Sequence, residues 1–170
     1  DVGYNGLTGS IPSLVGLTAM SSFDVSNNRL TGSIPSLSGL TALQWFFVRK
    51  NQLTGSIPSL SGLMSLLFLN ASGNQLSGPI PSLTGLTDLL LLDVGYNGLT
   101  DSIPPLDGLT ALQTFDVRIN QLTGPAPAAP PSLLPSQSDL CGNSLVSSGN
   151  LAIDAAWVTA AGNWLACQLG

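Results

Sequence analysis

The chain has 170 residues, of which 44% are hydrophobic and 8% charged, and its net charge is −5. Soluble domains usually carry about a quarter charged residues, so uncharged polar groups must cover much of this surface. The sequence contains no histidine, which excludes Ser-His and Cys-His catalytic pairs and His-ligated metals. With only four Lys and Arg residues, a nucleic-acid partner is not expected either, because it would need a basic patch.

Asparagine recurs every 23 residues over the first three quarters of the chain, at Asn5, Asn28, Asn51, Asn74, Asn97 and Asn120. Each is followed by leucine two positions later and by proline seven positions later. The fourth position after the asparagine is glycine in five of the six repeats and Asp101 in the other. A fixed period of this length predicts a solenoid, because one repeat cannot bury its apolar side alone.

Residues 43–63 have the sequence L-Q-W-F-F-V-R-K-N-Q-L-T-G-S-I-P-S-L-S-G-L. This resembles the leucine-rich-repeat pattern L-x-x-L-x-L-x-x-N-x-L, with Phe46 and Val48 at inner hydrophobic positions. The continuation L-T-G-x-I-P resembles the plant-specific class of polygalacturonase-inhibiting proteins and receptor-kinase ectodomains, whose repeat is usually one residue longer. The resemblance covers about residues 1–127. It implies an α/β repeat solenoid, a right-handed coil with a parallel concave sheet.

The apolar positions of one repeat are expected to point into the core of this coil. In the repeat just quoted they are Leu43, Phe46, Val48, Leu53, Ile57, Leu60 and Leu63. The repeated asparagine is expected to turn inward at a bend, where its amide can satisfy backbone groups of adjacent coils.

The repeat pattern fails after Pro127, where a Pro-rich connection begins. Farther on, Leu140-Cys141-Gly142 resembles a motif found just past the last repeat of plant receptor ectodomains. Over about 153–168, Ala, Trp and Leu at helical spacing predict a C-terminal capping helix. We therefore expect residues 1–127 to form six repeat registers, the first truncated, and residues 128–170 to form the connection and the cap.

Trp157 and Trp164 lie at core spacing on the predicted helix, and stacking on a sugar is the alternative. Cys141 and Cys167 predict a disulfide that closes a loop of about 26 residues; two buried thiols are the alternative. The low-Lys composition, rich in Ser, Thr and Gly, favours a secreted or cell-surface protein. The apolar runs are too short for membrane insertion, which needs about 18 residues.

Alternate residues of a strand face opposite sides, so the neighbours of the inner residues are expected on the concave surface. Exposed aromatic side chains with a charged rim are typical of an interaction site. The predicted binding residues are Trp45, Phe47, Arg49, Lys50, Phe68, Asn70, Leu91, Asp93, Tyr96, Asp116 and Arg118. We therefore predict a protein- or peptide-binding module that uses this face, without catalysis, cofactor or metal.

Asp93 and Asp116 are expected about 5 Å apart on adjacent strands, a carboxylate spacing also found in retaining glycosidases. Catalysis would need one acid with a raised pKa in a pocket, which a shallow solenoid face rarely provides, so an enzyme is not predicted. Asn70-Ala71-Ser72 is a glycosylation sequon on the same face, where a glycan would obstruct binding.

Two other functions stay open at this point. A column of hydroxyl groups could bind ice or carbohydrate through a regular, weakly charged surface: Thr8, Thr31, Thr54, Ser77, Thr100 and Thr123. Alternatively, the chain is a structural spacer within a larger surface protein.

Overall fold

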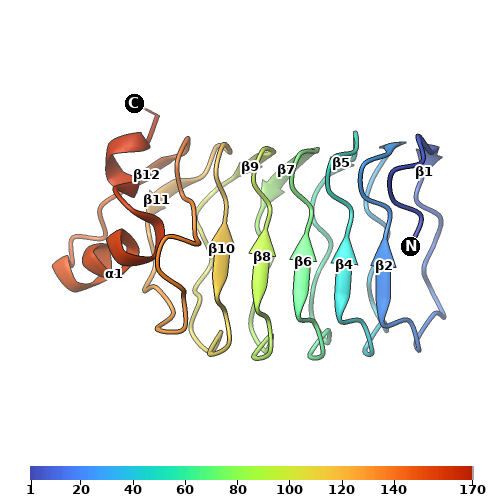
Figure 1. The fold of residues 1–170 in the computed structure, drawn as a ribbon, viewed down its shortest axis with the longest axis horizontal. Coiled ribbons are helices and arrows are strands. Elements are labelled where there is room, and N and C mark those ends of the chain that lie inside the picture. The colour runs from blue at the N-terminus through green and yellow to red at the C-terminus, as the bar shows by residue number, and fades with distance from the viewer. Residues whose placement is uncertain (170) are drawn as a thin grey trace.

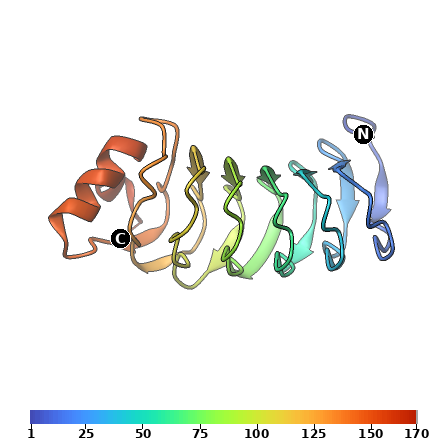
Figure 2. The same ribbon diagram turned by 90° about the horizontal axis from the view of Figure 1, so that it is seen from below.

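The computed structural model describes residues 1–169, which form a solenoid whose successive coils lie side by side (Figure 1). Each of five coils contributes one strand to a parallel sheet in the order β10-β8-β6-β4-β2. These strands are β2 (Ser22–Asp24), β4 (Trp45–Phe47), β6 (Phe68–Asn70), β8 (Leu91–Asp93) and β10 (Thr114–Asp116). The sheet lines the inner side of a gentle curve (Figure 2). The predicted parallel concave sheet is therefore confirmed.

The second side of each coil carries another short strand, and these strands pair into three small parallel sheets. They are β1 (Thr8–Ser10), β3 (Arg29–Thr31), β5 (Thr54–Gly55), β7 (Gln75–Pro79), β9 (Gly98–Thr100), β11 (Thr123–Pro125) and β12 (Ser144–Val146). Within residues 1–169, helix occurs only beyond these coils, near the C-terminus. Turns and extended segments therefore form the rest of each coil.

The core is a continuous stack of leucine, isoleucine, valine and phenylalanine side chains between the two sides. All seven residues predicted to point inward from the quoted repeat are buried, with at most 6% of their surface exposed. Phe46 also stacks on Phe23 of the preceding coil, with ring centroids 5.5 Å apart. Because each buried aliphatic or aromatic side chain contributes about 1.5–3 kcal/mol, the stacked coils supply the main stabilising term.

The repeated asparagine joins neighbouring coils through both ends of its amide. In one coil, Asn51 Oδ1 accepts the backbone N–H of Leu30 at 3.0 Å. Its Nδ2 donates to the carbonyl oxygens of Val25 at 3.0 Å and Val48 at 3.1 Å. The same bonds recur at Asn28, Asn74, Asn97 and Asn120. The predicted inward turn of this side chain is thus confirmed, and it satisfies backbone groups that would otherwise be buried without partners.

A further asparagine, Asn143, continues the ladder beyond the predicted end of the repeats. It lies 23 residues after Asn120 and is fully buried. Its Oδ1 accepts from the N–H of Leu122 at 3.1 Å, and its Nδ2 donates to Val117 at 3.0 Å. The division at residue 127 stays a prediction, and these bonds favour placing the end of the regular coil about Leu145 instead.

The C-terminal segment covers the end of the core with two short helices rather than the single helix expected over 153–168. Helix α1 spans Leu151–Ala161, and the 3-10 helix η1 spans Trp164–Cys167. The two are separate because Gly162 has a φ of 69°, which ends the α-helix. At the other end, Asn150 caps α1 by accepting from the N–H of Ala152 at 2.9 Å.

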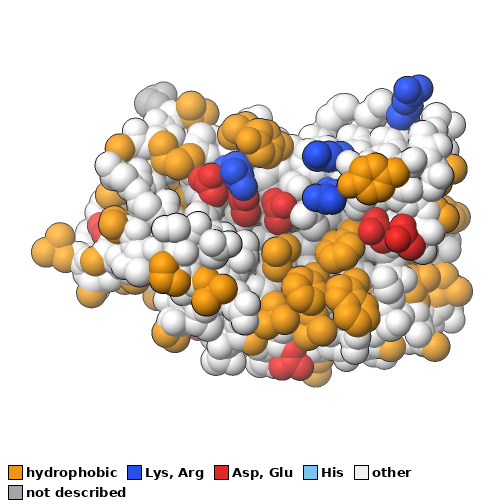
Figure 3. All heavy atoms as spheres, viewed as in Figure 1, with side chains coloured by type: hydrophobic (Ala, Val, Ile, Leu, Met, Phe, Trp, Pro, Cys, Tyr) orange, Lys and Arg blue, Asp and Glu red, His pale blue; other side chains and the backbone are white. Residues whose placement is uncertain are grey.

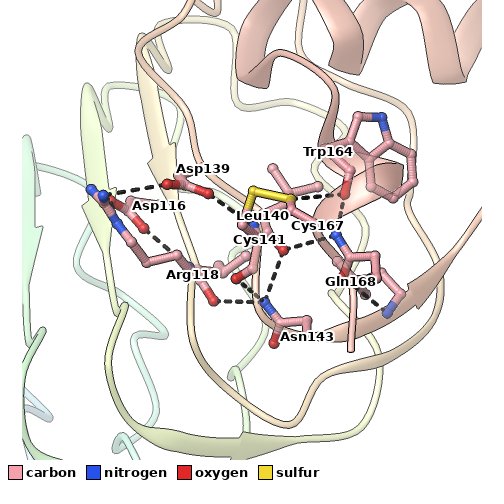
Figure 4. Close-up of a disulfide and its surroundings, with 11 residues drawn as sticks. Asp116, Arg118, Asp139, Leu140, Cys141, Asn143, Trp164, Cys167 and Gln168 are labelled. Atoms are coloured by element: carbon pink, nitrogen blue, oxygen red, sulfur yellow. Dashed lines mark hydrogen bonds and ion pairs between the residues drawn. A yellow bond between two sulfur atoms is a disulfide. The ribbon is translucent and has the colours of Figure 1, made fainter. Parts of the chain in front are cut away.

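Trp157 and Trp164 are completely buried, as predicted for core positions, so neither is available to stack on a sugar. Trp157 packs against Phe115 of the last strand of the concave sheet, with ring centroids 5.8 Å apart. The predicted disulfide joins Cys141 to Cys167 and ties η1 to the last coil (Figure 4). Neither helix within residues 1–169 has the length and apolar character required to span a membrane.

Candidate functional site on the concave face

The concave face consists of the outward side chains of β2, β4, β6, β8 and β10 and of the second and third residues after each strand. The first strand positions form one column, in which Trp45 pairs with Phe68 and Phe68 with Leu91. The third positions form another, in which Phe47 pairs with Asn70, Asn70 with Asp93 and Asp93 with Asp116. The columns assumed in the sequence analysis are therefore the columns of the structure.

Four apolar side chains of this face, Trp45, Phe47, Phe68 and Leu91, lie on three neighbouring strands. We call them the apolar patch, and hydrophobic side chains gather at the middle of this surface in Figure 3. Each is half-buried, because parallel strands about 4.8 Å apart place the side chains of one column against one another. Together they offer apolar surface to a ligand while keeping a fixed position.

Two adjacent hollows lie on the concave face. The apolar hollow, of about 260 Å³, is lined by Asp24, Phe47, Arg49, Phe68, Asn70 and Leu91. The polar hollow, of about 440 Å³, is lined by Arg49, Lys50, Ser72, Gly73, Asp93, Tyr96, Asp116 and Arg118. Every predicted binding residue except Trp45 thus lines one of the two hollows. Trp45 lies at the start of β4, beside Phe68.

The Asp and Asn side chains at the third strand positions also stabilise the turns after the strands, a role that was not predicted from the sequence. Each of these Asp or Asn side chains accepts the backbone N–H two residues later, which closes a turn after the strand. Asp24 accepts from Ser26 at 2.8 Å, and Asp93 from Gly95 at 3.1 Å. The same bond occurs at Asp1, Asn70, Asp116 and Asp139. The available signal was that Asp or Asn recurs at this position every 23 residues, with Phe47 as the exception.

Arg118 is held by two carboxylates at the end of the sheet nearest the cap. Its guanidinium bonds to the buried Asp116, with Nε donating to Oδ2 at 2.8 Å, and lies 3.3 Å from Asp139 (Figure 4). It also lies over the ring of Tyr96, 5.8 Å from the centroid. The hydrogen bond to Asp116 raises the pKa of Arg118. Asp139 was absent from the predicted site because it follows the Pro-rich connection.

Asp93 lies between Asn70 and Asp116 on the floor of the face. Its carboxylate accepts from Asn70 Nδ2 at 2.9 Å and from the N–H of Gly95. Burial, followed by the nearby charge of Asp116, raises the pKa of Asp93. This direction differs from the expectation that a shallow face would not raise the pKa of either acid. The carboxylates of Asp93 and Asp116 each accept a backbone N–H in the turn that follows, and Asp116 also forms an ion pair with Arg118.

The sequon asparagine is itself part of this network. Asn70 donates from Nδ2 to Asp93, and its Oδ1 accepts from the hydroxyl of Ser72 at 2.7 Å. A glycan on Nδ2 would therefore project from the floor of the concave face, between the two hollows.

The hydroxyl column considered for ice or carbohydrate lies on the second side of the coil. Five of its six members are exposed, and Thr100 is half-buried. The surface is not uniform, because Pro79 and Pro125 occupy strand positions where other repeats have serine, and Asp101 introduces a charge. The outer strands are also divided among three sheets.

The stacked coils, the asparagine ladder and the concave parallel sheet define a repeat protein of the leucine-rich type. The family model described as Leucine Rich Repeat matches residues 20–40 and 65–86. A structure of the BIR3–SERK2 complex from Arabidopsis thaliana is 30% identical, with a TM-score of 0.54, and the match covers 75% of this chain and 73% of that chain. The chain belongs to the leucine-rich-repeat family, and its repeats are of the plant type.

Two receptor structures are similar to this chain with higher TM-scores. One is the ectodomain of the Arabidopsis thaliana receptor kinase GASSHO1/SCHENGEN3 in complex with CASPARIAN STRIP INTEGRITY FACTOR 2, with a TM-score of 0.77 and 34% identity over 84% of this chain. The other is the plant peptide hormone receptor RGFR1 in complex with RGF2, with a TM-score of 0.76 and 35% identity over 84% of this chain. The matches span only 18% and 24% of those two chains. No match was found among curated protein sequences.

Proposed function

We propose that this chain is a peptide- or protein-binding module that acts through its concave face. The observation that carries the proposal is the apolar patch and its position beside Arg49 and Lys50, two cations that form no ion pair within residues 1–169. A contiguous apolar surface with a polar border is the usual composition of an interface centre. The rigid stack of coils fixes these side chains before a ligand arrives, which lowers the entropic cost of binding.

The comparisons support a peptide ligand in particular. The similar receptor structures contain CASPARIAN STRIP INTEGRITY FACTOR 2 and RGF2, and PEPR1, 28% identical over 92% of this chain, was solved with AtPEP1. A peptide in an extended conformation presents side chains at intervals of about 3.3 Å along its length. Such a ligand could reach the apolar hollow and the polar hollow at once.

The compartment proposed for this function is extracellular. The Cys141–Cys167 disulfide needs an oxidising environment to persist. The similar structures include receptor ectodomains. No observation favours ice or carbohydrate over a peptide, because Trp45, Phe47 and Phe68 lie on the concave face rather than beside the hydroxyl column.

The proposal is tested by selecting binders from a random peptide library against the full chain. Affinities of the selected peptides are then measured for wild type, Trp45→Ala and Phe68→Ala. Truncation of an aromatic side chain at the centre of an interface costs about 2 kcal/mol or more, so each variant should bind at least about 30-fold more weakly.

Met64→Ala is the matched control, because it also removes a large apolar side chain. Met64 is 66% exposed and lies outside the strands of the concave sheet. This variant should bind like wild type, and circular dichroism should show the same fold in all three variants. Undiminished binding by both concave-face variants would overturn the proposal.

A further inference from the structure

The polar hollow exists because small residues lie between large ones in successive coils. Arg49 and Lys50 follow β4, Ser72 and Gly73 follow β6, and the next long side chains, Tyr96 and Arg118, come from the following two coils. Adjacent strands are about 4.8 Å apart, so one coil with small side chains opens a space about two strand spacings wide. A Cβ on Gly73 would lie 3.5 Å from Lys50 Cγ, which shows how closely the two coils meet there.

The charged side chains around this hollow differ in the ion pairs and hydrogen bonds that they form. Asp116 is bonded to Arg118, and Asp93 accepts from Asn70 and Gly95. Arg118 is shared between Asp116 and Asp139. By contrast, Arg49 has only a long hydrogen bond of 3.5 Å to the Tyr4 hydroxyl, and Lys50 is exposed. Among the described residues that line this hollow, the two charges with neither an ion pair nor a short hydrogen bond are therefore both positive.

The lining of the polar hollow is also positive in a chain that is otherwise acidic. Three cations and two carboxylates line it, which leaves one net positive charge, whereas the whole chain carries −5. Arg49 lines the apolar hollow as well. A group bound to Arg49 would thus lie directly beside an apolar group seated among Phe47, Phe68 and Leu91.

We propose that Arg49 and Lys50 bind an acidic side chain of a peptide ligand whose neighbouring apolar side chain occupies the apolar hollow. This rests on the proposed function, and it specifies the ligand as a peptide with Asp or Glu close to a large apolar residue. A carboxylate can accept charge-assisted hydrogen bonds from a guanidinium and an ammonium together. A basic side chain would meet two unpaired cations and carboxylates that already have partners.

The experiment uses the full chain and the peptides selected from a random library. Selected peptides should be enriched in Asp or Glu near Leu, Phe or Trp. Replacing that acid by its amide should weaken binding to wild type about tenfold, the size expected for one hydrogen bond between charged groups. Arg49→Gln and Lys50→Gln should weaken binding of the acidic peptide similarly, and neither variant should distinguish it strongly from the amide peptide.

Arg29→Gln is the matched control, because Arg29 is an exposed cation on β3, outside the concave face. It should keep the wild-type preference for the acidic peptide. Added salt should weaken binding to wild type more than binding to Arg49→Gln, since screening acts on the charged pair. Peptides that bind the concave face with no acidic preference, or full preference in both Gln variants, would overturn this inference alone. A library with no binder at all would overturn the proposed function and this inference with it.

Discussion

Asn51 Oδ1 accepts a hydrogen bond from the backbone N–H of Leu30 at 3.0 Å, across the boundary between two successive coils. The same amide donates to the carbonyls of Val25 and Val48, one in each coil. One side chain therefore satisfies three buried backbone groups and links two coils at a bend where the strand ladder has ended. This relationship explains why asparagine, rather than an apolar residue, marks the period of the sequence.

Asn51→Ala should be strongly destabilising, because it leaves those backbone groups buried without partners. The expected loss in the free energy of unfolding is about 3 kcal/mol. Asn5→Ala is the matched control: Asn5 is exposed, and its side chain bonds only within the first coil. That change should cost less than about 1 kcal/mol. Urea denaturation followed by circular dichroism measures both, and equal costs would contradict the role of the ladder.

Most of the fold could be predicted because every coil must bury the same set of apolar positions. Phe46 and Val48 must be buried and Trp45 must face outward whenever a strand alternates, and the structure agrees. The last member of the ladder, Asn143, was missed because the Pro-rich connection precedes it and because Asn150, rather than proline, stands seven positions later, although Leu145 keeps the expected leucine. The helix prediction over 153–168 failed at Gly162, whose positive φ interrupts what the apolar spacing alone suggested.

The residue before each asparagine of the ladder adopts a left-handed conformation, and at position 119 this residue is isoleucine. Ile119 has a φ of 51° and is 48% exposed. A β-branched residue is strained there, whereas asparagine tolerates this region, and Asn27 already occupies the equivalent position with a φ of 57°.

Ile119→Asn should therefore raise the free energy of unfolding by about 1 kcal/mol. Val15→Asn, which replaces another exposed β-branched residue outside the left-handed positions, should give no such gain. Thermal denaturation compares the two variants with wild type. A decrease in stability for Ile119→Asn would mean that the backbone strain costs less free energy than the contact of Ile119 with Gly142 contributes.

The disulfide should contribute substantially to the stability of the cap. It closes a loop with a sequence separation of 26 residues, for which the entropy lost by the unfolded chain corresponds to about 3 kcal/mol. The double variant Cys141→Ser/Cys167→Ser should be less stable by that amount in urea denaturation. A reducing agent should destabilise wild type and leave the double variant unchanged, and insensitivity of wild type to reduction would contradict the prediction.

The raised pKa of Asp93 has a definite consequence for the pH dependence of stability. Because the folded chain holds the Asp93 proton more tightly than the unfolded chain, this group favours folding most below its ordinary pKa of 3.8. That contribution is lost as the pH rises through the raised value in the folded chain. At neutral pH, the ionised and partly buried carboxylate therefore opposes folding.

Asp93→Asn should consequently raise the melting temperature at neutral pH, and the gain should shrink as the pH falls toward 3.8. The new amide keeps an acceptor for the N–H of Gly95 and can donate to Asp116, as Asn70 does to Asp93. Asp88→Asn, at an exposed turn position, should change little at either pH. A gain for Asp93→Asn that is independent of pH would show that charge is not its cause.

The candidate site was less accessible to prediction than the fold. The strand columns follow from the period, so Trp45, Phe68 and Leu91 could be aligned in advance. Two features depend on how side chains fold over their neighbours: Arg118 bends back onto Asp116, and Asn70 donates to Asp93. These contacts leave Arg49 and Lys50 as the unpaired cations, a distinction that residue spacing alone does not contain.

The most direct measurement is hydroxyl-radical footprinting of the chain with and without a peptide selected from the random library. This method reports the solvent access of aromatic and sulfur-containing side chains. We expect the bound peptide to reduce oxidation of Trp45, Phe47 and Phe68, while the exposed Met64 reacts as before. Unchanged oxidation of those three aromatic residues, with protection at Met64 or elsewhere outside the concave sheet, would contradict our assignment of the binding surface.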